Sequence, residues 1–193
     1  ADNAMHFKTV VKTAALRNGL YADFSPKPLA GEAGNGMHIN MSVKCQDGAD
    51  ASEAFLAGVL AHVREITAFL NPVESSYRRL GEHKAPRYIT WSPENRSQLI
   101  RIPAAQGEYR RLELRSPDPM ANPYLAYALL IHAGLDGIRR NLSAPLPVNE
   151  NLYTAPESLT STLEQLPGSL AEAKELARGS AFVASILPAG MLD

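Results

Sequence analysis

The sequence lacks several features that would place it in a common class of protein. Cys45 is the single cysteine among 193 residues, so the chain has no internal disulfide and suits a reducing compartment. Its apolar runs fall short of the roughly 20 residues that a membrane-spanning helix needs, and no signal peptide is recognisable at the start. The formal net charge of −1 gives no reason to expect a nucleic acid or a membrane surface as partner. These absences favour a cytoplasmic protein.

Familiar catalytic motifs are missing as well. There is no P-loop of the type GxxxxGK[ST], and no GxGxxG follows a predicted strand. No nucleophile elbow frames a serine. The glycine-rich stretch GEAGNG, residues 31–36, needs no role beyond turning the chain. The chemistry of the protein must therefore be sought in side chains that the predicted strands bring together.

Apolar periodicity predicts an α+β domain. Helical spacing and capping signals predict three long helices and a C-terminal group of short ones, over residues 3–18, 51–70, 124–140 and 157–187. Alternating and β-rich runs predict strands, at residues 37–44, 87–92, 97–103 and 110–115. Several strands beside long helices favour a sheet with helices on one face and the other face free for chemistry.

The run RRLELR raises the central chemical question. As a strand it places Leu112 and Leu114 on one face, and the charged residues Arg111, Glu113 and Arg115 on the other. Polar groups from neighbouring strands should share that face: His38, Asn40, Ser42, Arg96 and Arg101. Arginines around one carboxylate cannot neutralise one another, and arginine suits phosphate and carboxylate recognition, so an anionic ligand is the economical explanation. Exposed salt bridges on a solvated sheet are the alternative.

Longer motifs carry a resemblance to a known family. GNGMHINMS, NRSQLIRIP, RRLELRSPDPMANPYLAYALLIHAGLDGI and NLY closely resemble the catalytic domain of glutamine synthetase, from residue 1 to about residue 187. The resemblance implies a curved antiparallel sheet, a partial barrel, with helices packed on one face. It also implies ATP-dependent ligation of ammonia to glutamate through γ-glutamyl phosphate, with Mg²⁺ or Mn²⁺ ions, in a homo-oligomer.

The same resemblance assigns roles to individual residues. His38 and Glu113 look like ligands of the metal that bridges the ATP phosphates. The residues that resemble phosphate and nucleotide contacts are Arg96, Arg101, Arg111, Asn40 and Ser42. Arg96 and Arg101 also resemble the groups that stabilise the transferring phosphoryl group, and many family members have histidine in place of Asn40. The residues that resemble the glutamate site are Arg79, Arg115 and, through its backbone, Gly34.

The chain departs from the family pattern in one loop. In GEHKAP the family has a glutamate immediately before Ala-Pro, which closes over the site and takes a proton from the attacking ammonium. Here the position is Lys84, and Glu82 would substitute only if the loop shifts. Two other functions therefore stay open, a γ-glutamyl ligase for another amine and a non-catalytic homologue. A guanidino kinase with a similar curved sheet does not fit the motifs.

A second departure concerns extent. The resemblance implies that residues 1–193 are a partial catalytic domain. In the family, glutamates of a second metal site lie upstream of the matching segment, and an N-terminal β-grasp domain donates an aspartate to the neighbouring subunit. We therefore expect the isolated chain to be inactive.

Overall fold

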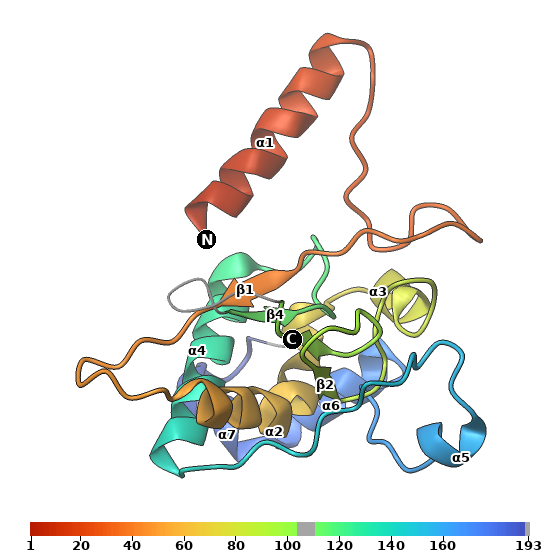
Figure 1. Cartoon of the computed structure of the whole chain (residues 1–193). Helices are drawn as coiled ribbons and strands as arrows, with labels where there is room; N and C mark the ends of the chain where they lie inside the picture. Colours follow the sequence, from red (N-terminus) through yellow and green to blue (C-terminus); the bar gives the residue numbers. More distant parts are fainter. Residues whose placement is uncertain (104–110, 192–193) are drawn as a thin grey trace.

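A small open sheet and two long helices form the body of the protein (Figure 1). The structure is a computed structural model that describes residues 1–103 and 111–191. The strands are β1 (Ile39–Met41), β2 (Trp91–Ser92), β3 (Ile100–Arg101) and β4 (Leu112–Leu114), in the order β1-β4-β3-β2. The helices are α1 (Asp2–Arg17), α2 (Ser52–Leu70), α3 (Glu74–Arg79), α4 (Pro123–Arg139), α5 (Glu157–Thr160), α6 (Leu170–Gly179) and α7 (Ala181–Ile186). The predicted α+β class is confirmed.

The pairing of the strands places Glu113 in the middle of the sheet. β4 is antiparallel to β1 and to β3, and Glu113 is paired with Asn40 on one side and Arg101 on the other. β2 and β3 are parallel, so this pair differs from the antiparallel sheet that we expected. Between them Ser92 and Asn95 accept hydrogen bonds from backbone amides two residues further on, which folds the connection into successive turns instead of a hairpin.

The core lies between the sheet and α2 with α4. The α2 residues predicted to face the core are all buried, namely Phe55, Leu56, Val59, Leu60, Val63, Ile66 and Phe69. Glycines let the two helices touch, because a Cβ on Gly58 would lie 2.2 Å from the carbonyl oxygen of Ala133. Asn122 caps α4 by accepting from the amide of Tyr124 at 3.0 Å, and Pro123 occupies the first turn as predicted.

Two predictions about elements need correction. The strands are shorter than the predicted runs, because ladder pairing extends over only two or three residues in each. The segment 71–86, in which neither a helix nor a strand was predicted, contains α3. This short helix follows Pro72, has Glu74 in its first turn and ends on Arg78 and Arg79, which complements the helix dipole.

Helix α1 stands apart from the body in Figure 1, joined to it by a long extended segment. None of its residues is buried, and Phe7, Val10 and Leu16 are 62 %, 65 % and 70 % exposed. Lys8 donates to the carbonyl oxygen of Pro119 at 2.6 Å, which fixes the base of the helix on the loop before α4. Within the residues described, none of the helices combines the length and apolarity that crossing a lipid bilayer requires.

Candidate active site

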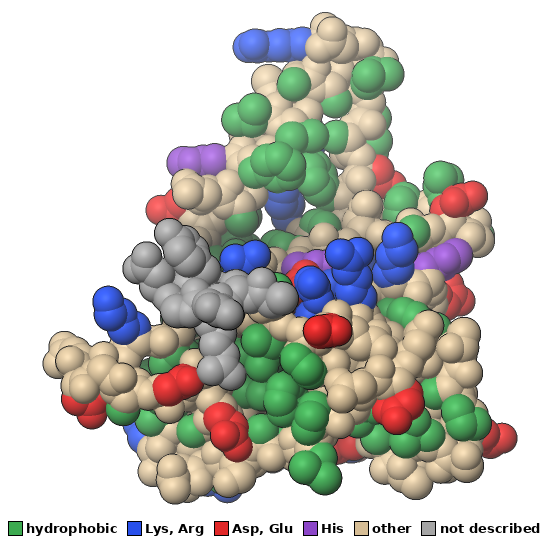
Figure 2. Space-filling view, viewed as in Figure 1, with side chains coloured by type: hydrophobic (Ala, Val, Ile, Leu, Met, Phe, Trp, Pro, Cys, Tyr) green, Lys and Arg blue, Asp and Glu red, His purple; other side chains and the backbone are tan. Residues whose placement is uncertain are grey.

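Glu113 of β4 is the centre of the polar face of the sheet. Its Oε1 lies 3.0 Å from Nη1 of Arg115 and 2.9 Å from Nδ1 of His38, and its Oε2 lies 3.0 Å from Nη1 of Arg101. Leu112 and Leu114 point the other way into the core, 2 % and 0 % exposed. The alternation in RRLELR therefore produces an apolar face toward the core and a polar face opposite it, as predicted. Figure 2 shows cationic side chains gathered on this part of the surface, with acidic and histidine side chains among them.

The charges of the cluster set the protonation of Glu113 and His38. Burial alone would raise the pKa of Glu113, but the hydrogen bond from Arg101 and the charge of Arg115 outweigh it and hold this pKa below its usual value. Burial, and then the charge of Arg115, lower the pKa of His38. A neutral His38 donates through Nδ1 to Glu113, so its Nε2 carries the lone pair that a metal ion needs.

Arg115 connects Glu113 to two loops. Its side chain is 5 % exposed, and besides Glu113 it donates from Nε to the carbonyl oxygen of Arg96 at 3.0 Å. Its Nη2 donates to the carbonyl oxygen of Lys84 at 3.5 Å. Arg96 and Lys84 therefore join the cluster through their backbones, while their side chains are exposed. Arg101 is fixed in a similar way, since its Nε donates to the carbonyl oxygen of Glu94 at 3.1 Å.

Arg79 lies buried beneath the glycine-rich segment. Its Nη1 donates to the carbonyl oxygen of Ser116 at 2.7 Å and its Nη2 to that of Arg115 at 3.3 Å. A Cβ on Gly34 would lie 3.0 Å from the Arg79 stem, and one on Gly36 would lie 2.6 Å from its Nη2. Only glycine leaves room for this contact. Gly34 and Arg79, two of the residues that resemble the family's glutamate site, are thus in direct contact.

A buried polar network under Arg79 was missed by sequence reasoning. Asp118 is fully buried and accepts from Asn71 Nδ2 at 2.9 Å and from the amide of Met120 at 2.9 Å. Asn71 also donates to the Ser116 carbonyl that Arg79 contacts, at 2.8 Å. Burial raises the pKa of Asp118, although hydrogen bonds from Ser76 and Asn71 and the charge of Arg79 oppose the rise. The motif SPDP, a polar residue between two prolines, was the available signal.

Other predicted residues lie around the cluster and not within it. In the part of the chain that the structure describes, only His38, Arg101 and Arg115 lie within ion-pair distance of Glu113. Arg111 is exposed and lies immediately before β4. Asn40 and Ser42 line a groove of about 590 Å³ together with His38, and α4 forms the opposite wall.

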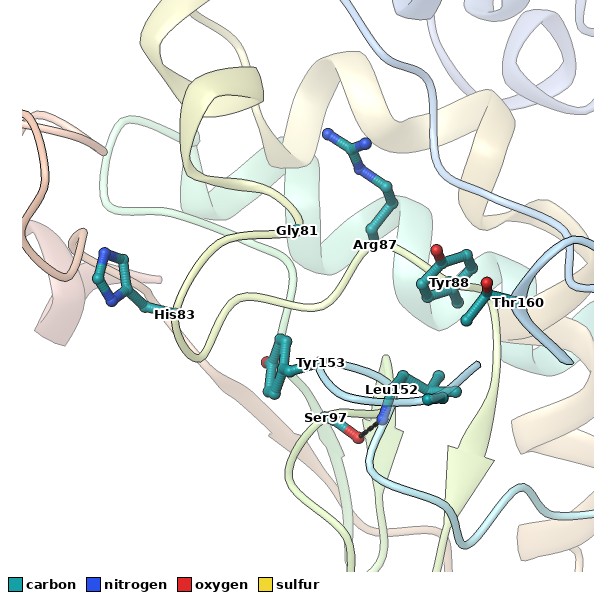
Figure 3. A pocket seen from close by; sticks show the side chains of 9 residues that line it. Gly81, His83, Arg87, Tyr88, Ser97, Leu152, Tyr153 and Thr160 are labelled. Carbon is teal, nitrogen blue, oxygen red and sulfur yellow. Dashed lines mark hydrogen bonds between the residues drawn. The ribbon is translucent and has the colours of Figure 1, made fainter. Parts of the chain in front are cut away.

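A second cavity, of about 490 Å³, opens beside the loop that carries Lys84 (Figure 3). Gly81 and His83 lie on one side of it, and Ser97, Leu152 and Tyr153 on the other. Ser97 fixes that second side by accepting from the amide of Leu152 at 3.0 Å. Burial raises the pKa of Tyr153, while the charges of Arg115 and Arg79 oppose the rise. Arg115 also contacts the loop beside this cavity, through its bond to the carbonyl oxygen of Lys84. Tyr153 belongs to the motif NLY, to which we assigned no role.

The donors of the cluster fit part of a magnesium site. His38 offers one nitrogen and Glu113 one carboxylate, and across residues 1–103 and 111–191 no group of three or more acidic, histidine or cysteine side chains converges. Mg²⁺ is commonly held by one or two carboxylates together with substrate phosphates and water. His38 and Glu113 therefore suit an ion that arrives with a nucleotide.

Comparison with known proteins settles the family. Residues 1–193 match the family described as glutamine synthetase, catalytic domain. The chain belongs to the glutamine synthetase family. Over 97 % of this chain's length it is 44 % identical to the glutamine synthetase of Methanosarcina mazei. Over 91 % of this chain's length it is 45 % identical to the glutamine synthetase of Thermotoga maritima. It spans 45 % and 43 % of these two relatives, so it covers about half of a full-length family member.

Solved structures agree with this assignment. A structure described as a GmaS/ADP complex superimposes with a TM-score of 0.85 at 35 % identity, covering 97 % of this chain and 47 % of that one. A second structure, described as GmaS without ligand, gives a TM-score of 0.83 at 36 % identity, covering 97 % of this chain and 46 % of that one. The fold and the family are therefore established together. The family implies ATP and a divalent metal ion as reaction components.

Proposed function

We propose that the full-length protein uses ATP to join ammonia to the γ-carboxylate of glutamate, and that residues 1–193 form part of its catalytic domain. The observation that carries the proposal is the cluster in which Glu113 contacts His38, Arg101 and Arg115. Such a cluster offers cations to phosphate and carboxylate groups and one carboxylate to a metal ion. In this family, that combination fits a ligase with an acyl-phosphate intermediate.

The reaction has two steps. An oxygen of the glutamate γ-carboxylate attacks the γ-phosphorus of ATP and ADP leaves, which gives γ-glutamyl phosphate. Ammonia then attacks the acyl carbon, the bond to phosphate breaks, and the nitrogen loses a proton. Phosphoryl transfer leaves little covalent chemistry to the protein, so positioning and cationic stabilisation carry the catalysis.

The residues divide between the two substrates. Arg96 and Arg101 suit the phosphate that is transferred, with Arg111, Asn40 and Ser42 toward the nucleotide. The glutamate side is assigned to Arg79, Arg115 and Gly34. When bound, Mg²⁺ or Mn²⁺ at His38 and Glu113 supplies the positive charge that neutralises the ATP phosphates. The buried anchors of Arg79 and Arg115 hold these guanidinium groups still, which reduces the reorganisation that binding requires.

A second candidate differs only in the amine. Lys84 stands where the family has a proton-accepting glutamate, and its side chain is exposed in the loop beside the second cavity. The similarity to GmaS supports γ-glutamyl ligase activity in general, and it leaves the identity of the amine substrate open. A non-catalytic homologue that binds its ligands without turnover is the remaining alternative.

Measuring the release of phosphate from ATP by the full-length protein, with different amines present, distinguishes these three functions. We expect release from Mg²⁺-ATP that requires both glutamate and ammonia. Faster release with methylamine than with ammonia would favour the second candidate. Binding of glutamate and nucleotide in calorimetry without release under any amine would show the non-catalytic homologue.

A further inference from the structure

Lys27 and Glu82 join the glycine-rich segment to the loop that carries Lys84. Nζ of Lys27 lies 2.9 Å from Oε2 of Glu82, and it also donates to the carbonyl oxygen of Glu32 at 2.6 Å. The Lys27 side chain is 7 % exposed, whereas that of Glu82 is 57 % exposed. The ammonium of Lys27 is therefore largely removed from water, and Glu82 contacts it from a surface loop.

The loop on the Glu82 side is tightly folded. The amide of Gly81 donates to the carbonyl oxygen of Ala85 at 3.1 Å, and the amide of Ala85 donates to that of Glu82 at 3.0 Å. Gly81 and His83 both have positive φ, 87° and 50°, which closes the turn. A contact at Glu82 therefore positions the whole segment 81–85, including Lys84.

The segment on the Lys27 side is the one that covers Arg79. The amide of Asn35 donates to the carbonyl oxygen of Pro26 at 2.9 Å, and its side chain donates to that of Ser25 at 2.8 Å. These bonds fold residues 25–36 into one unit, with Gly34 on the Arg79 stem. The ion pair thus ties the cover of Arg79 to the neighbouring loop.

Burial makes this ion pair more than a surface contact. An exposed lysine–glutamate pair contributes little, because water solvates both partners equally well when they part. Lys27 lacks that alternative, since a largely buried ammonium without its counter-charge is unfavourable. The hydrogen bond and charge of Lys27 also lower the pKa of Glu82, which makes Glu82 a weaker base. Glu82 is thereby engaged as an ion-pair partner and is poorly suited to replace the missing proton acceptor.

We propose that Lys27 and Glu82 are positioning residues that hold the 81–85 loop over the acyl-phosphate site and keep water out of it. The proposal rests on the proposed γ-glutamyl ligase function. When the loop opens, a water oxygen attacks the acyl carbon of γ-glutamyl phosphate, the carbon–oxygen bond to phosphate breaks, and a proton goes to solvent. Glutamate and phosphate result, and one ATP is consumed without ligation.

The first test is a double-mutant cycle on the full-length enzyme. Lys27→Met and Glu82→Gln are compared by the ratio of phosphate released without amine to product formed with saturating amine. We expect each to raise the ratio on the order of tenfold, which corresponds to about 1.4 kcal/mol in the balance of open and closed loops. The double variant should match Lys27→Met alone, because both changes remove the same contact. Lys27→Arg, which keeps the charge, should stay close to wild type.

The matched control is Glu164→Lys, which reverses one charge of the exposed Arg64–Glu164 pair at 3.3 Å. It should leave the ratio unchanged. Additive effects of Lys27→Met and Glu82→Gln would overturn the proposal, and so would an unchanged ratio in both.

The second test needs no catalytic activity and separates the two proposals. Amide hydrogen exchange of residues 82–85, measured without substrates, should be faster in Lys27→Met than in wild type and unaffected in Glu164→Lys. Unchanged exchange would overturn the ion-pair proposal even in an active enzyme. A wild-type protein without ligase activity would overturn the proposed function, while faster exchange in Lys27→Met would still establish that the pair holds the loop.

Discussion

At the scale of single residues, the buried guanidinium of Arg79 is stabilised by the charge of a carboxylate of the protein itself, that of Asp118. Burial, and then the charge of Arg115, lower the pKa of Arg79, while the negative charge of Asp118 opposes that shift. Asp118 also accepts from Asn71, which donates to the Ser116 carbonyl oxygen that Arg79 contacts. Asp118 therefore acts on the proposed glutamate site through Arg79.

Asp118→Asn should weaken glutamate binding. The substitution keeps the size of the side chain but removes the charge and presents an amide to the donor Asn71, at a cost of about 1–3 kcal/mol for the mismatched buried group. We expect the KM for glutamate to rise several-fold while the KM for ATP stays constant. The exposed Asp2→Asn is the control. An equal rise in both KM values would indicate a general loss of structure.

Lys84 offers a second prediction at this scale. A lysine side chain is cationic where the family has a carboxylate, so at this position it repels ammonium and offers no carboxylate to accept its proton. General acid–base assistance is typically worth about 10² to 10⁴ in rate. In the full-length protein, Lys84→Glu should raise glutamine formation at limiting ammonia, and raise it less with hydroxylamine, which is neutral.

The exposed Lys12→Glu controls for the change in net charge. Unchanged rates with both amines in Lys84→Glu would show that this loop position plays no part in proton transfer. That result would favour a different amine as substrate.

How well the sequence predicted each residue depends on the range of its contacts. The convergence of Glu113, Arg101 and His38 follows from strand alternation, a local rule with a period of two. Arg79 was assigned through motif resemblance alone, because its partners are carbonyl groups at residues 115 and 116. The Lys27–Glu82 pair joins two loops whose approach no periodicity encodes.

At the scale of elements, long periodic helices were predicted better than strands. The bounds of α2 and α4 agree with prediction to within one or two residues, because their apolar stripes are long. Strand ends were overestimated, since β-rich runs do not show where hydrogen-bond pairing stops. The close contact of α2 with α4 through three glycines was not predicted either.

Glycine at this contact should be essential to stability. A Cβ on Gly137 would lie 2.1 Å from the carbonyl oxygen of Ala54, so Gly137→Ala forces the helices apart and should cost about 1–3 kcal/mol. Gly179→Ala is the matched control, because nothing lies within 4 Å of its Cβ position. Urea unfolding monitored by circular dichroism would measure both. Equal stability of the two variants would contradict the packing argument.

An ionic contact between helices gives a prediction on pH. His62 of α2 lies 2.8 Å from Asp136 of α4 and 3.0 Å from Glu65, and it stacks on Phe182 of α7 at 3.8 Å. The hydrogen bond from His62, and then Arg140, lower the pKa of Asp136. A carboxyl with a lowered folded-state pKa stabilises the protein above its unfolded-state pKa, about 3.9, and this contribution disappears as pH falls through the folded-state value.

Asp136→Asn should therefore reduce stability at pH 7 and lose its effect in acid. Denaturant midpoints of wild type and variant, measured from pH 7 to pH 3, should converge at the acid end. The exposed Glu175→Gln, which removes a carboxylate charge elsewhere on the surface, serves as control. A difference that is constant over this range would mean that the ionised carboxylate does not stabilise the contact.

At the scale of the whole molecule, the family and fold class could be read from the sequence, but the placement of α1 could not. The motifs span most of the chain, and the matching family covers residues 1–193. The apolar spacing of residues 3–18 predicted a helix, and α1 confirms it, but the apolar residues Phe7, Val10 and Leu16 of α1 are exposed. Periodicity shows which face of a helix is apolar and not what covers it.

The isolated chain of residues 1–193 should lack ligase activity. His38 and Glu113 suit one Mg²⁺ ion that arrives with a nucleotide, but among the described residues no group of three or more metal-binding side chains converges to hold a further ion. The chain also spans less than half of its curated relatives, and the exposed apolar face of α1 favours association of isolated chains. We expect no phosphate release that depends on both glutamate and ammonia, and concentration-dependent association in sedimentation experiments. The full-length protein under the same conditions is the control. Turnover by residues 1–193 alone would show that the cluster around Glu113 suffices for catalysis, and would contradict the argument from donor number.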